Sequence, residues 1–404
     1  QSFFFLLSLS FIARLRKILC AEVTMIPRNL YDSDHEIFRQ SVRKFIETQA
    51  VPHHDEWEKN GMVSDDIWLG AGAQGFLCPT VSEEYGGVEA DFKYNCIVNE
   101  EIARSGCTGL GWTLHSDIAV PYIERYGTDF QKQKYLPKCV SGELITAIAM
   151  SEPGAGSDLQ GAKTTAVLRG DHYILNGSKT FITNGQKSGL VIVVAKTDVN
   201  AGSKGISLFL VESEFEGFSK GKNLEKLGMK AQDTSELFFQ DVKVPKENLL
   251  GEEGRGFIYL MQDLPQERLS IAVGAIANAQ ALLESTISYT KERKAFGAPI
   301  ASFQNTQFKL AELSAEISSA EVFLDRCTEL LLNDELDTVT ASKLKLVATD
   351  LQCKVADECL QLHGGWGYMW EYPVCRAFAD SRVQRIYGGS NEIMKLIISR
   401  ELMK

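Results

Sequence analysis

Apolar residues recur at helical spacing in the first part of the chain. Ser33 and Glu36 form an S-x-x-E capping box, and the apolar residues that follow return every three or four positions. Asn95–Ser105 and Gln131–Leu136 show the same pattern, and glycines and prolines separate the segments. The pattern predicts a helical region over residues 30–145.

The pattern changes in the middle of the chain. Val191–Ala195 and Ile206–Val211 are uninterrupted apolar runs rich in β-branched residues, which is typical of buried strands. Asn176-Gly177 predicts a hairpin turn between two strand-like segments, and Asn184-Gly185 predicts a second turn. Residues 146–253 are therefore predicted to form a small antiparallel β domain.

Long helices return after residue 254. Ile271–Tyr289 is apolar on nearly every helical face, which predicts burial in a bundle, while Ala311–Leu332 and Ser342–Leu362 are long and amphipathic. Helices, then strands, then helices predict an α+β fold with an N-terminal helical domain, a middle antiparallel β domain and a C-terminal helical bundle. A chain of 404 residues is long enough for this division. The expected boundaries are 1–29 for a targeting or non-structural segment, then 30–145, 146–253 and 254–404.

The first residues differ from the rest of the chain. Gln1–Leu19 is apolar and then basic, and the first acidic residue is Glu22. The apolar run Phe3–Phe11 is too short to span a bilayer. With the basic residues behind it, the segment resembles a degraded secretory h-region or an organellar transit peptide, but it matches neither type cleanly, and Met25 is an alternative start. No later stretch predicts a transmembrane helix.

Composition narrows the class of function. The net charge of −11, from 53 acidic and 42 basic residues, argues against binding of the nucleic-acid backbone. Nine scattered cysteines are a poor disulfide framework and suit small buried thiols in a reducing compartment. The absence of C-x-x-C and H-E-x-x-H patterns means that no metal site is predicted.

Two glycine-rich segments are candidates for phosphate binding. Gly70–Gly75 (GAGAQG) follows no strand, so it predicts a helix end and not a dinucleotide loop, and the chain has no P-loop motif. Met150–Asp158 (MSEPGAGSD) lets backbone approach a ligand, and its hydroxyls and N–H groups can donate to anionic oxygens. A tight surface turn after a strand explains the second segment equally well.

Two further segments have ordinary structural interpretations. Leu362–Gly367 (LHGGWG) is typical of a helix C-cap, with His363 as a structural hydrogen bonder. In Asp263–Leu269 (DLPQERL), Pro265 predicts the first turn of a helix with Asp263 near its cap. Glu267 and its neighbour Arg268 then fall in that first turn, where a charged pair is usually solvated.

Five motifs together resemble the signatures of the acyl-CoA dehydrogenase family, in its order and spacing. They are AMSEPGAGSD at 149–158, NGSKTFITNG at 176–185, ERKAFG at 292–297, QLHGGWGY at 361–368 and YGGSNEI at 387–393. The resemblance extends from about residue 30 to the end. LPQERL, KAQDTSELFF and HGGWGYMWEYP are most similar to the long-chain members, and isovaleryl-CoA dehydrogenase is the nearest alternative.

The resemblance implies a homotetramer in which each subunit binds FAD. It places Thr183 at the N5/O4 edge of the flavin and Ser157 near the FAD pyrophosphate or the CoA. The residues implied to hold the pyrophosphate and adenosine of a neighbouring subunit's FAD are Arg293, Phe296, Gln304, Gln361, Gly364 and Gly365, and Ser390 and Glu392 are implied to lie along that cofactor. The other implied cofactor contacts are Ile148, Met150, Ser151, Gly156, Phe181, Ile182, Leu362, His363 and Asn391.

Two positions depart from the common family pattern. Phe181 stands where many members have Trp beside the flavin, which keeps an aromatic face. Gly388 stands where many members have the catalytic Glu, directly after Tyr387, and glycine cannot accept a proton. In the long-chain and isovaleryl types the base lies on an earlier helix, and the matching residue here is Glu267.

The implied reaction needs a base beside a weakly acidic acyl α-proton and donors to the carbonyl oxygen. Glu267 is expected to take the proton, while the backbone N–H of Gly388 and an FAD hydroxyl hold the developing enolate. The other expected substrate contacts are Ser157, Pro265, Gln266, Arg268 and Gly389. Burial by flavin and acyl chain should raise the pKa of Glu267, partly opposed by Arg268.

The resemblance also implies the setting: β-oxidation in the mitochondrial matrix, with fatty acyl-CoA as substrate and electron-transfer flavoprotein as electron acceptor. An acyl-CoA oxidase and a non-catalytic acyl-CoA-binding scaffold are the rival functions. The acyl chain length is left open.

Overall fold

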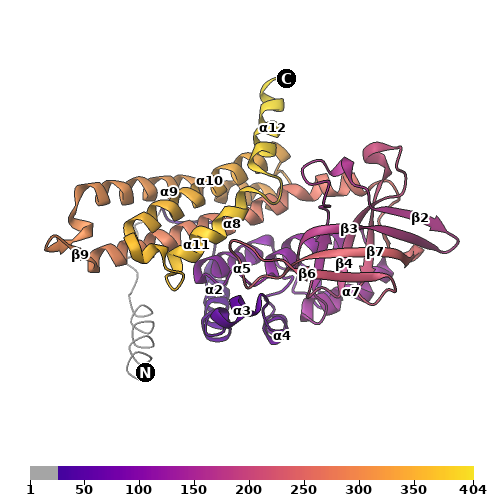
Figure 1. Ribbon diagram of the computed structural model, residues 1–404, viewed down its shortest axis with the longest axis horizontal. Helices are drawn as coiled ribbons and strands as arrows, with labels where there is room; N and C mark the ends of the chain where they lie inside the picture. The colour runs from indigo at the N-terminus through magenta and orange to yellow at the C-terminus, as the bar shows by residue number, and fades with distance from the viewer. Residues whose placement is uncertain (1–25) are drawn as a thin grey trace.

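The computed structural model describes residues 26–404, which combine helices at both ends of the chain with a β-sheet between them (Figure 1). The long helices α8, α9 and α10 lie side by side along the longest dimension, and the sheet packs at one end of them. The expected segment Gln1–Leu19, Cys20 and the alternative start Met25 lie outside the described residues. The expected α+β class is confirmed.

The N-terminal region of the chain is helical. Its helices are α2 (Ser33–Phe45), η1 (Ile46–Ala50), α3 (His54–Asn60), α4 (Asp66–Ala73), α5 (Phe92–Ser105), η3 (Leu114–Ala119), α6 (Val120–Tyr126) and α7 (Asp129–Ser141). The expected capping box is wrong by one residue, because Asp32 is the N-cap and His35 completes the box. Asp32 takes this role because its carboxylate reaches the backbone N–H groups of Asp34 and His35.

GAGAQG is the end of α4, as the sequence predicted. A Cβ at Gly72 would lie 2.2 Å from the carbonyl oxygen of Ser141, so α4 and α7 approach too closely there for a side chain. The glycines of this segment serve helix packing.

The sheet has one main path and one parallel pair. Its strands are β1 (Thr146–Ala149), β2 (Thr165–Arg169), β3 (His172–Thr183), β4 (Leu190–Lys196), β5 (Ile206–Glu212), β6 (Phe218–Asn223), β7 (Thr234–Pro245) and β8 (Leu249–Leu250), in the order β6-β7-β3-β2-β4-β5-β8 with β1 beside β4. Most pairs are antiparallel, as expected, but β1 and β4 run parallel and β2 meets β4 at one parallel position. The middle region is therefore a mixed sheet.

The expected hairpin at Asn176-Gly177 is wrong. Both residues lie within the continuous strand β3, which pairs with β7 on either side of a register shift at this point. A Cβ at Gly177 would lie 2.4 Å from Thr164 Oγ1, so glycine is needed at this irregularity in the strand. The second expected turn is confirmed, since β3 ends at Thr183 and residues 184–187 form a turn.

The C-terminal region is built on a helix of 37 residues. Its elements are α8 (Gly256–Glu292), β9 (Lys294–Ala295), β10 (Ala298–Pro299), α9 (Gln304–Leu332), α10 (Thr338–His363), η8 (Gly364–Tyr368), α11 (Pro373–Ser381) and α12 (Asn391–Leu402). In Figure 1, α12 projects away from the rest of the chain. At about 1.5 Å per residue, α8 is about 55 Å long.

Pro265 is not in the first turn of a helix, as expected, but well inside α8. A proline in a helix interior removes one hydrogen bond and costs about 3 kcal/mol. Buried residues precede it, among them Tyr259 and Leu260, and burial of this earlier segment lets the helix begin nine residues before the proline. Glu267 and Arg268 therefore lie in a helix interior and not at a solvated start.

The core divides into three clusters. One joins the N-terminal helices to one face of the sheet, through Leu190, Ile192 and Val194 of β4. The alternate residues Val191 and Val193 pack on the other face, against side chains of β3 and β7. The third cluster lies among α8, α9 and α10. Because α8 contacts both α5 and α10, it connects the N-terminal helices to the C-terminal bundle.

Among residues 26–404 the eight cysteines are all free thiols, and six of them are buried. No helix in this range is long and apolar enough to cross a membrane. No cluster of potential metal ligands is found in the same range.

Candidate active site

Glu267 is enclosed where α8 meets α6. Its residue surface is 4% exposed, and Oε1 accepts a hydrogen bond of 2.8 Å from the Tyr122 hydroxyl, which is itself buried. Oε2 has no hydrogen-bond partner among residues 26–404, and it is not one of the fully enclosed atoms that lack a partner. One carboxylate oxygen is therefore held by the protein, while the other keeps accessible surface.

The environment of Glu267 raises its pKa to about 7. Burial is the largest cause, because a desolvated carboxylate favours its neutral form, and the nearby Asp263 acts in the same direction. The Tyr122 hydrogen bond, Arg268 and Arg125 oppose this shift. A group with this pKa can both accept and release a proton near neutrality.

Tyr122, the partner of Glu267, is one of three residues of α6 that contact α8, together with Arg125 and Tyr126. Arg125 forms an ion pair with Asp263 and also donates to Gln266, and the Tyr126 hydroxyl donates to Asp263 over 2.7 Å. Gln266 in turn donates to the backbone carbonyl of Asp117 in η3 over 2.7 Å. The three residues of α6 lie on one helical face, so this face fixes how α6 sits on α8.

Arg268 has an incomplete set of partners. It is 2% exposed, its guanidinium donates to Ser342 Oγ over 3.1 Å, and its Nε is enclosed without a partner in the described part of the chain. The same part of α10 supplies Lys345, whose ammonium donates to the Gly389 carbonyl and to Asn391 Oδ1. Burial and the positive charge of Arg268 lower the pKa of Lys345 to about 8. Two buried cations thus flank the loop that precedes α12.

Gly388 and Gly389 form that loop with φ of +64° and +88°, values that favour glycine. A Cβ on Gly388 would lie 2.3 Å from Ile271 Cδ1. Ile271 is one helical turn after Glu267 on α8, so Gly388 lies against the same segment of helix that carries the carboxylate. The structure therefore brings together the two positions that the sequence pairs as alternative locations of the base.

The residues expected around the flavin gather on β1 and β3. Thr180 donates its backbone N–H to the Ser151 carbonyl, and the buried Lys179 donates to the Met150 carbonyl and to Glu152. Ile148 and Ile182 are buried, while Thr183 is half-buried at the end of β3. Strand β3 and the segment after β1 are thus bound to each other.

Phe181 is the exposed member of this group. Its surface is 70% exposed, its φ is +60°, and it lies at the second register shift between β3 and β7. A bulge of this kind redirects a side chain, and a non-glycine residue in this region is strained. The ring faces away from the core, in a position that suits contact with a planar ligand.

The loop after β1 is open on its glycine side. A Cβ on Gly154 or Gly156 would meet no atom of the chain within 4 Å, and Ser157 is exposed. Glu152 anchors the loop by accepting from Lys163 and Thr164 backbone N–H groups. The segment is therefore a turn after a strand, as one of the two interpretations predicted, and its glycines also leave space for a ligand's approach.

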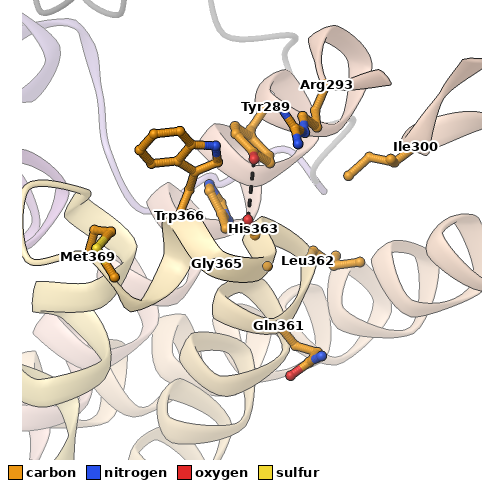
Figure 2. A pocket seen from close by; sticks show the side chains of 10 residues that line it. Tyr289, Arg293, Ile300, Gln361, Leu362, His363, Gly365, Trp366 and Met369 are labelled. Carbon is orange, nitrogen blue, oxygen red and sulfur yellow. Dashed lines mark hydrogen bonds between the residues drawn. The ribbon is translucent and has the colours of Figure 1, made fainter. Parts of the chain in front are cut away.

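A separate pocket of about 480 Å³ lies at the far end of the bundle (Figure 2). Its lining comes from the ends of α8 and α10, from η7 (Ile300–Ser302) and from η8, and includes the expected residues Arg293, Gln361, Leu362, His363, Gly364 and Gly365. Gly364 ends α10 with φ of +59°, so the expected C-cap is confirmed. The rings of His363 and Tyr289 stack with centroids 4.1 Å apart and His363 Nδ1 donates to the Cys359 carbonyl, so His363 has a structural role as well as lining the pocket.

This pocket suits an anionic ligand. Arg293 forms no ion pair with any of residues 26–404, and a Cβ on Gly364 or Gly365 would meet no atom within 4 Å. An unpaired guanidinium beside open glycine backbone is an arrangement that binds phosphate oxygens. Phe296 is 99% exposed on the β9–β10 hairpin, and Gln304 is exposed at the start of α9; neither lines the pocket.

The expected residues of the 390–392 segment have different surroundings. Ser390 caps α12 by accepting from the Ile393 N–H. Asn391 is buried, and its amide contacts Thr349, Asp350 and Lys345. Glu392 is exposed. Asn391 therefore anchors the loop within the chain, and Glu392 remains open to a ligand or a neighbouring molecule.

Several residues of the site escaped the sequence analysis. Tyr122 is 145 positions from Glu267, and Lys345 is 44 positions from Gly389. No local pattern marks either residue, since each lies in an ordinary helical segment. Only the packing of α6 and α10 on α8 brings them to the site.

The chain matches family models of the N-terminal, middle and C-terminal domains of acyl-CoA dehydrogenases over residues 32–143, 147–242 and 254–403. The chain therefore belongs to the acyl-CoA dehydrogenase family, and it is an oxidoreductase. This confirms the family that the five motifs predicted.

Two named relatives show which members it resembles. It is 54% identical over 378 residues to the mitochondrial long-chain specific acyl-CoA dehydrogenase of Mus musculus, which covers 93% of this chain and 88% of that protein. It is 40% identical over 378 residues to the mitochondrial isovaleryl-CoA dehydrogenase of Solanum tuberosum, covering 93% and 92%.

Two solved structures share the fold. An acyl-CoA dehydrogenase from Geobacillus kaustophilus has a TM-score of 0.92 and 50% identity, covering 93% of this chain and 100% of that one. An acyl-CoA dehydrogenase from Bacillus anthracis, complexed with FAD, has a TM-score of 0.88 and 32% identity, covering 96% and 71%.

The raised pKa of Glu267 predicts a pH-dependent cost to folding. As pH rises from 4.5 towards 7, the unfolded chain loses a proton that the folded chain keeps, so stability falls across this window and is level above it. The loss is about 3 kcal/mol, at 1.36 kcal/mol per pKa unit. Glu267→Gln should remove this loss of stability. The free energy of unfolding of the variant, measured by urea titration of the apoprotein, should therefore rise relative to that of the parent between about pH 4 and about pH 8.

Glu316→Gln is the matched control, because the Glu316 carboxylate is half-exposed and pairs with Lys354 on the surface. Removing this surface ion pair should change stability by at most about 1 kcal/mol, so no gain over the parent of the size expected for Glu267→Gln should appear. An equal pH dependence in both variants, or none in Glu267→Gln, would contradict the buried carboxylate described here.

Proposed function

We propose that this protein is an FAD-dependent acyl-CoA dehydrogenase that converts fatty acyl-CoA to trans-2-enoyl-CoA, with Glu267 as the base. The observation that carries the proposal is a buried carboxylate of raised pKa on α8, one helical turn from Ile271, which packs against the glycine loop where many members carry their base. Oε2 of Glu267, the oxygen that does not accept the Tyr122 hydrogen bond, can take the acyl α-proton. FAD, when bound, supplies the acceptor for the β-hydride at N5.

The chain's own groups account for the rest of the proton abstraction. We infer that the backbone N–H of Gly388 donates to the thioester oxygen as negative charge develops there. Arg268 lies beside the loop with an unused Nε–H, and its charge favours both the ionised base and an anionic substrate oxygen. A bound acyl chain would complete the enclosure of the site by α6, α8 and α10, and the loss of water there would strengthen these interactions.

The cofactor contacts support an oligomer. Arg293, the C-cap of α8, is 26 positions after Glu267, which is a rise of about 39 Å at 1.5 Å per residue. A single FAD cannot reach from the base to the bundle-end pocket of the same chain. We infer that Phe181, Thr183 and Ser157 bind one FAD, whose pyrophosphate and adenosine enter the bundle-end pocket of a neighbouring subunit in a homotetramer.

The setting follows from the relatives. The Mus musculus protein at 54% identity is named long-chain specific and mitochondrial, and the isovaleryl-CoA dehydrogenase is less similar at 40%. We infer that the substrate is a long-chain fatty acyl-CoA, that the protein acts in β-oxidation in the mitochondrial matrix, and that electron-transfer flavoprotein accepts the electrons.

The first prediction concerns cofactor and substrate. The purified protein should be yellow, with flavin absorbance, and should reduce an electron-transfer flavoprotein fastest with long-chain substrates in a panel from butyryl-CoA to stearoyl-CoA plus isovaleryl-CoA. A maximum with isovaleryl-CoA would make it a branched-chain enzyme. Rapid peroxide formation would make it an oxidase, and acyl-CoA binding without turnover would make it a scaffold.

The second prediction isolates the base. Glu267→Gln keeps the size of the side chain and removes its basicity, so turnover should fall by about 10² to 10⁴-fold, the usual effect of losing a general base. FAD content and acyl-CoA affinity should persist, because the proposed cofactor contacts lie on other elements. Turnover within a few-fold of the parent would show that Glu267 is a buried structural carboxylate.

The third prediction moves the carboxylate. Ile271 Cδ1 fills the space that a side chain at position 388 needs, so the transfer requires Ile271→Ala with Gly388→Glu. Alanine is the appropriate replacement for Glu267, because that position is inside a helix. The triple variant E267A/I271A/G388E should exceed E267A/I271A in turnover by roughly tenfold or more, as expected of a restored general base.

Position 388 has a left-handed φ, which costs a non-glycine residue roughly 1–2 kcal/mol, so the triple variant should be less stable than its parent. If Glu267→Gln is inactive and the triple variant shows full FAD content without recovery, then positions 267 and 388 do not reach the same α-carbon.

A further inference from the structure

Tyr122 holds the proposed base from a different helix. Its ring is completely buried, and its hydroxyl supplies the one hydrogen bond that the Glu267 carboxylate accepts from residues 26–404. Pro121 and the preceding π-helix η3 start α6 just before it. The ring therefore has no room to adopt another position without moving α6.

The rest of the α6 face makes this contact rigid. Arg125 and Tyr126, three and four residues after Tyr122, bind Asp263 on the turn of α8 that precedes Glu267. Gln266 is held as well, by Arg125 and by the Asp117 carbonyl. Three residues of α6 thus fix the catalytic turn of α8 in position, and Tyr122 is the member of this set that contacts the carboxylate.

We propose, resting on the function proposed above, that Tyr122 is a positioning residue of the reaction: its hydroxyl holds Oε1 of Glu267 so that Oε2 faces the substrate's α-carbon as the ionised base. A Tyr O–H donated to an ionised carboxylate is a charge-assisted hydrogen bond and favours the charged form. When Glu267 has taken the α-proton on Oε2, Oε1 remains an acceptor, so the contact persists through the step.

The electrostatics around Glu267 agree with this role. On α8, Asp263 raises the pKa of the carboxyl and Arg268 lowers it; on α6, Tyr122 and Arg125 lower it; and α10 places Lys345 beside Arg268. Among the groups that lower the pKa of Glu267, the Tyr122 hydroxyl has the largest effect. Without its hydroxyl the carboxyl should hold its proton to higher pH, and less of the enzyme would carry the free base near neutrality.

The test is Tyr122→Phe, followed by stopped-flow flavin reduction with a long-chain acyl-CoA across the pH range. The hydroxyl is removed and the ring remains. The pH at which the reduction rate reaches half its maximum should move upward by about 1 to 2 units, the shift expected from losing a hydrogen bond to a charged group. The rate at neutral pH should fall by about 5-fold to 50-fold and approach the parent's at high pH, with acyl-CoA affinity little changed.

Tyr135→Phe is the matched control. Tyr135 is also buried, and its hydroxyl donates to a glutamate, Glu212, over 2.8 Å, but it lies on α7 against the sheet. Its variant should keep the parent's pH midpoint even if it loses a similar amount of stability. A merely structural role for Tyr122 would lower the rate at every pH and leave the midpoint in place.

The outcomes separate the two proposals. An unmoved midpoint in Tyr122→Phe, with Glu267→Gln inactive, overturns the positioning role and leaves the base assignment intact. Near-normal flavin reduction by Glu267→Gln overturns the base assignment and this inference together. A shifted midpoint in Tyr122→Phe alone, with the Tyr135→Phe midpoint unchanged, supports the inference.

Discussion

Removing a carboxylate from water is costly unless the protein replaces its hydration, and the surroundings of Glu267 show how that replacement is shared. One oxygen receives the Tyr122 hydroxyl, and Arg268 and Arg125 add positive charge. These groups come from two helices and act against burial, which remains the larger effect. The result is a carboxyl with a pKa of about 7, and the contacts between α6 and α8 hold it in place.

The length of α8 explains why one helix serves two sites. The first half of α8 carries Glu267 beside α6, and Arg293 caps the end of the helix beside the glycines that follow α10. A rigid helix keeps these positions far apart within one chain. Cofactor binding and assembly are therefore expected to depend on each other, because each flavin site would be completed by a neighbouring subunit.

The sequence predicted what depends on local pattern and missed what depends on packing. Helical periodicity located the long C-terminal helices, and the β-branched runs located β4 and β5. Asn176-Gly177 misled because pairing with β7 along both halves of β3 outweighs the local preference for a turn. Pro265 misled because burial on both sides of it outweighs one lost hydrogen bond. Glu267 was identified only through the family resemblance, and Tyr122 was not identified at all, because the contact between them spans 145 positions.

Abstraction of the α-proton by Glu267 is the central claim, and it can be measured apart from hydride transfer. A 3-thia-acyl-CoA has sulfur in place of the β-methylene, so its α-protons can leave but no β-hydride can follow. In D₂O, NMR of this ligand bound to the flavin-loaded protein should show deuterium entering the α-position. The account predicts that Glu267→Gln binds the ligand with similar affinity and slows this exchange by about 10²-fold or more. Exchange at the parent's rate in Glu267→Gln would contradict it.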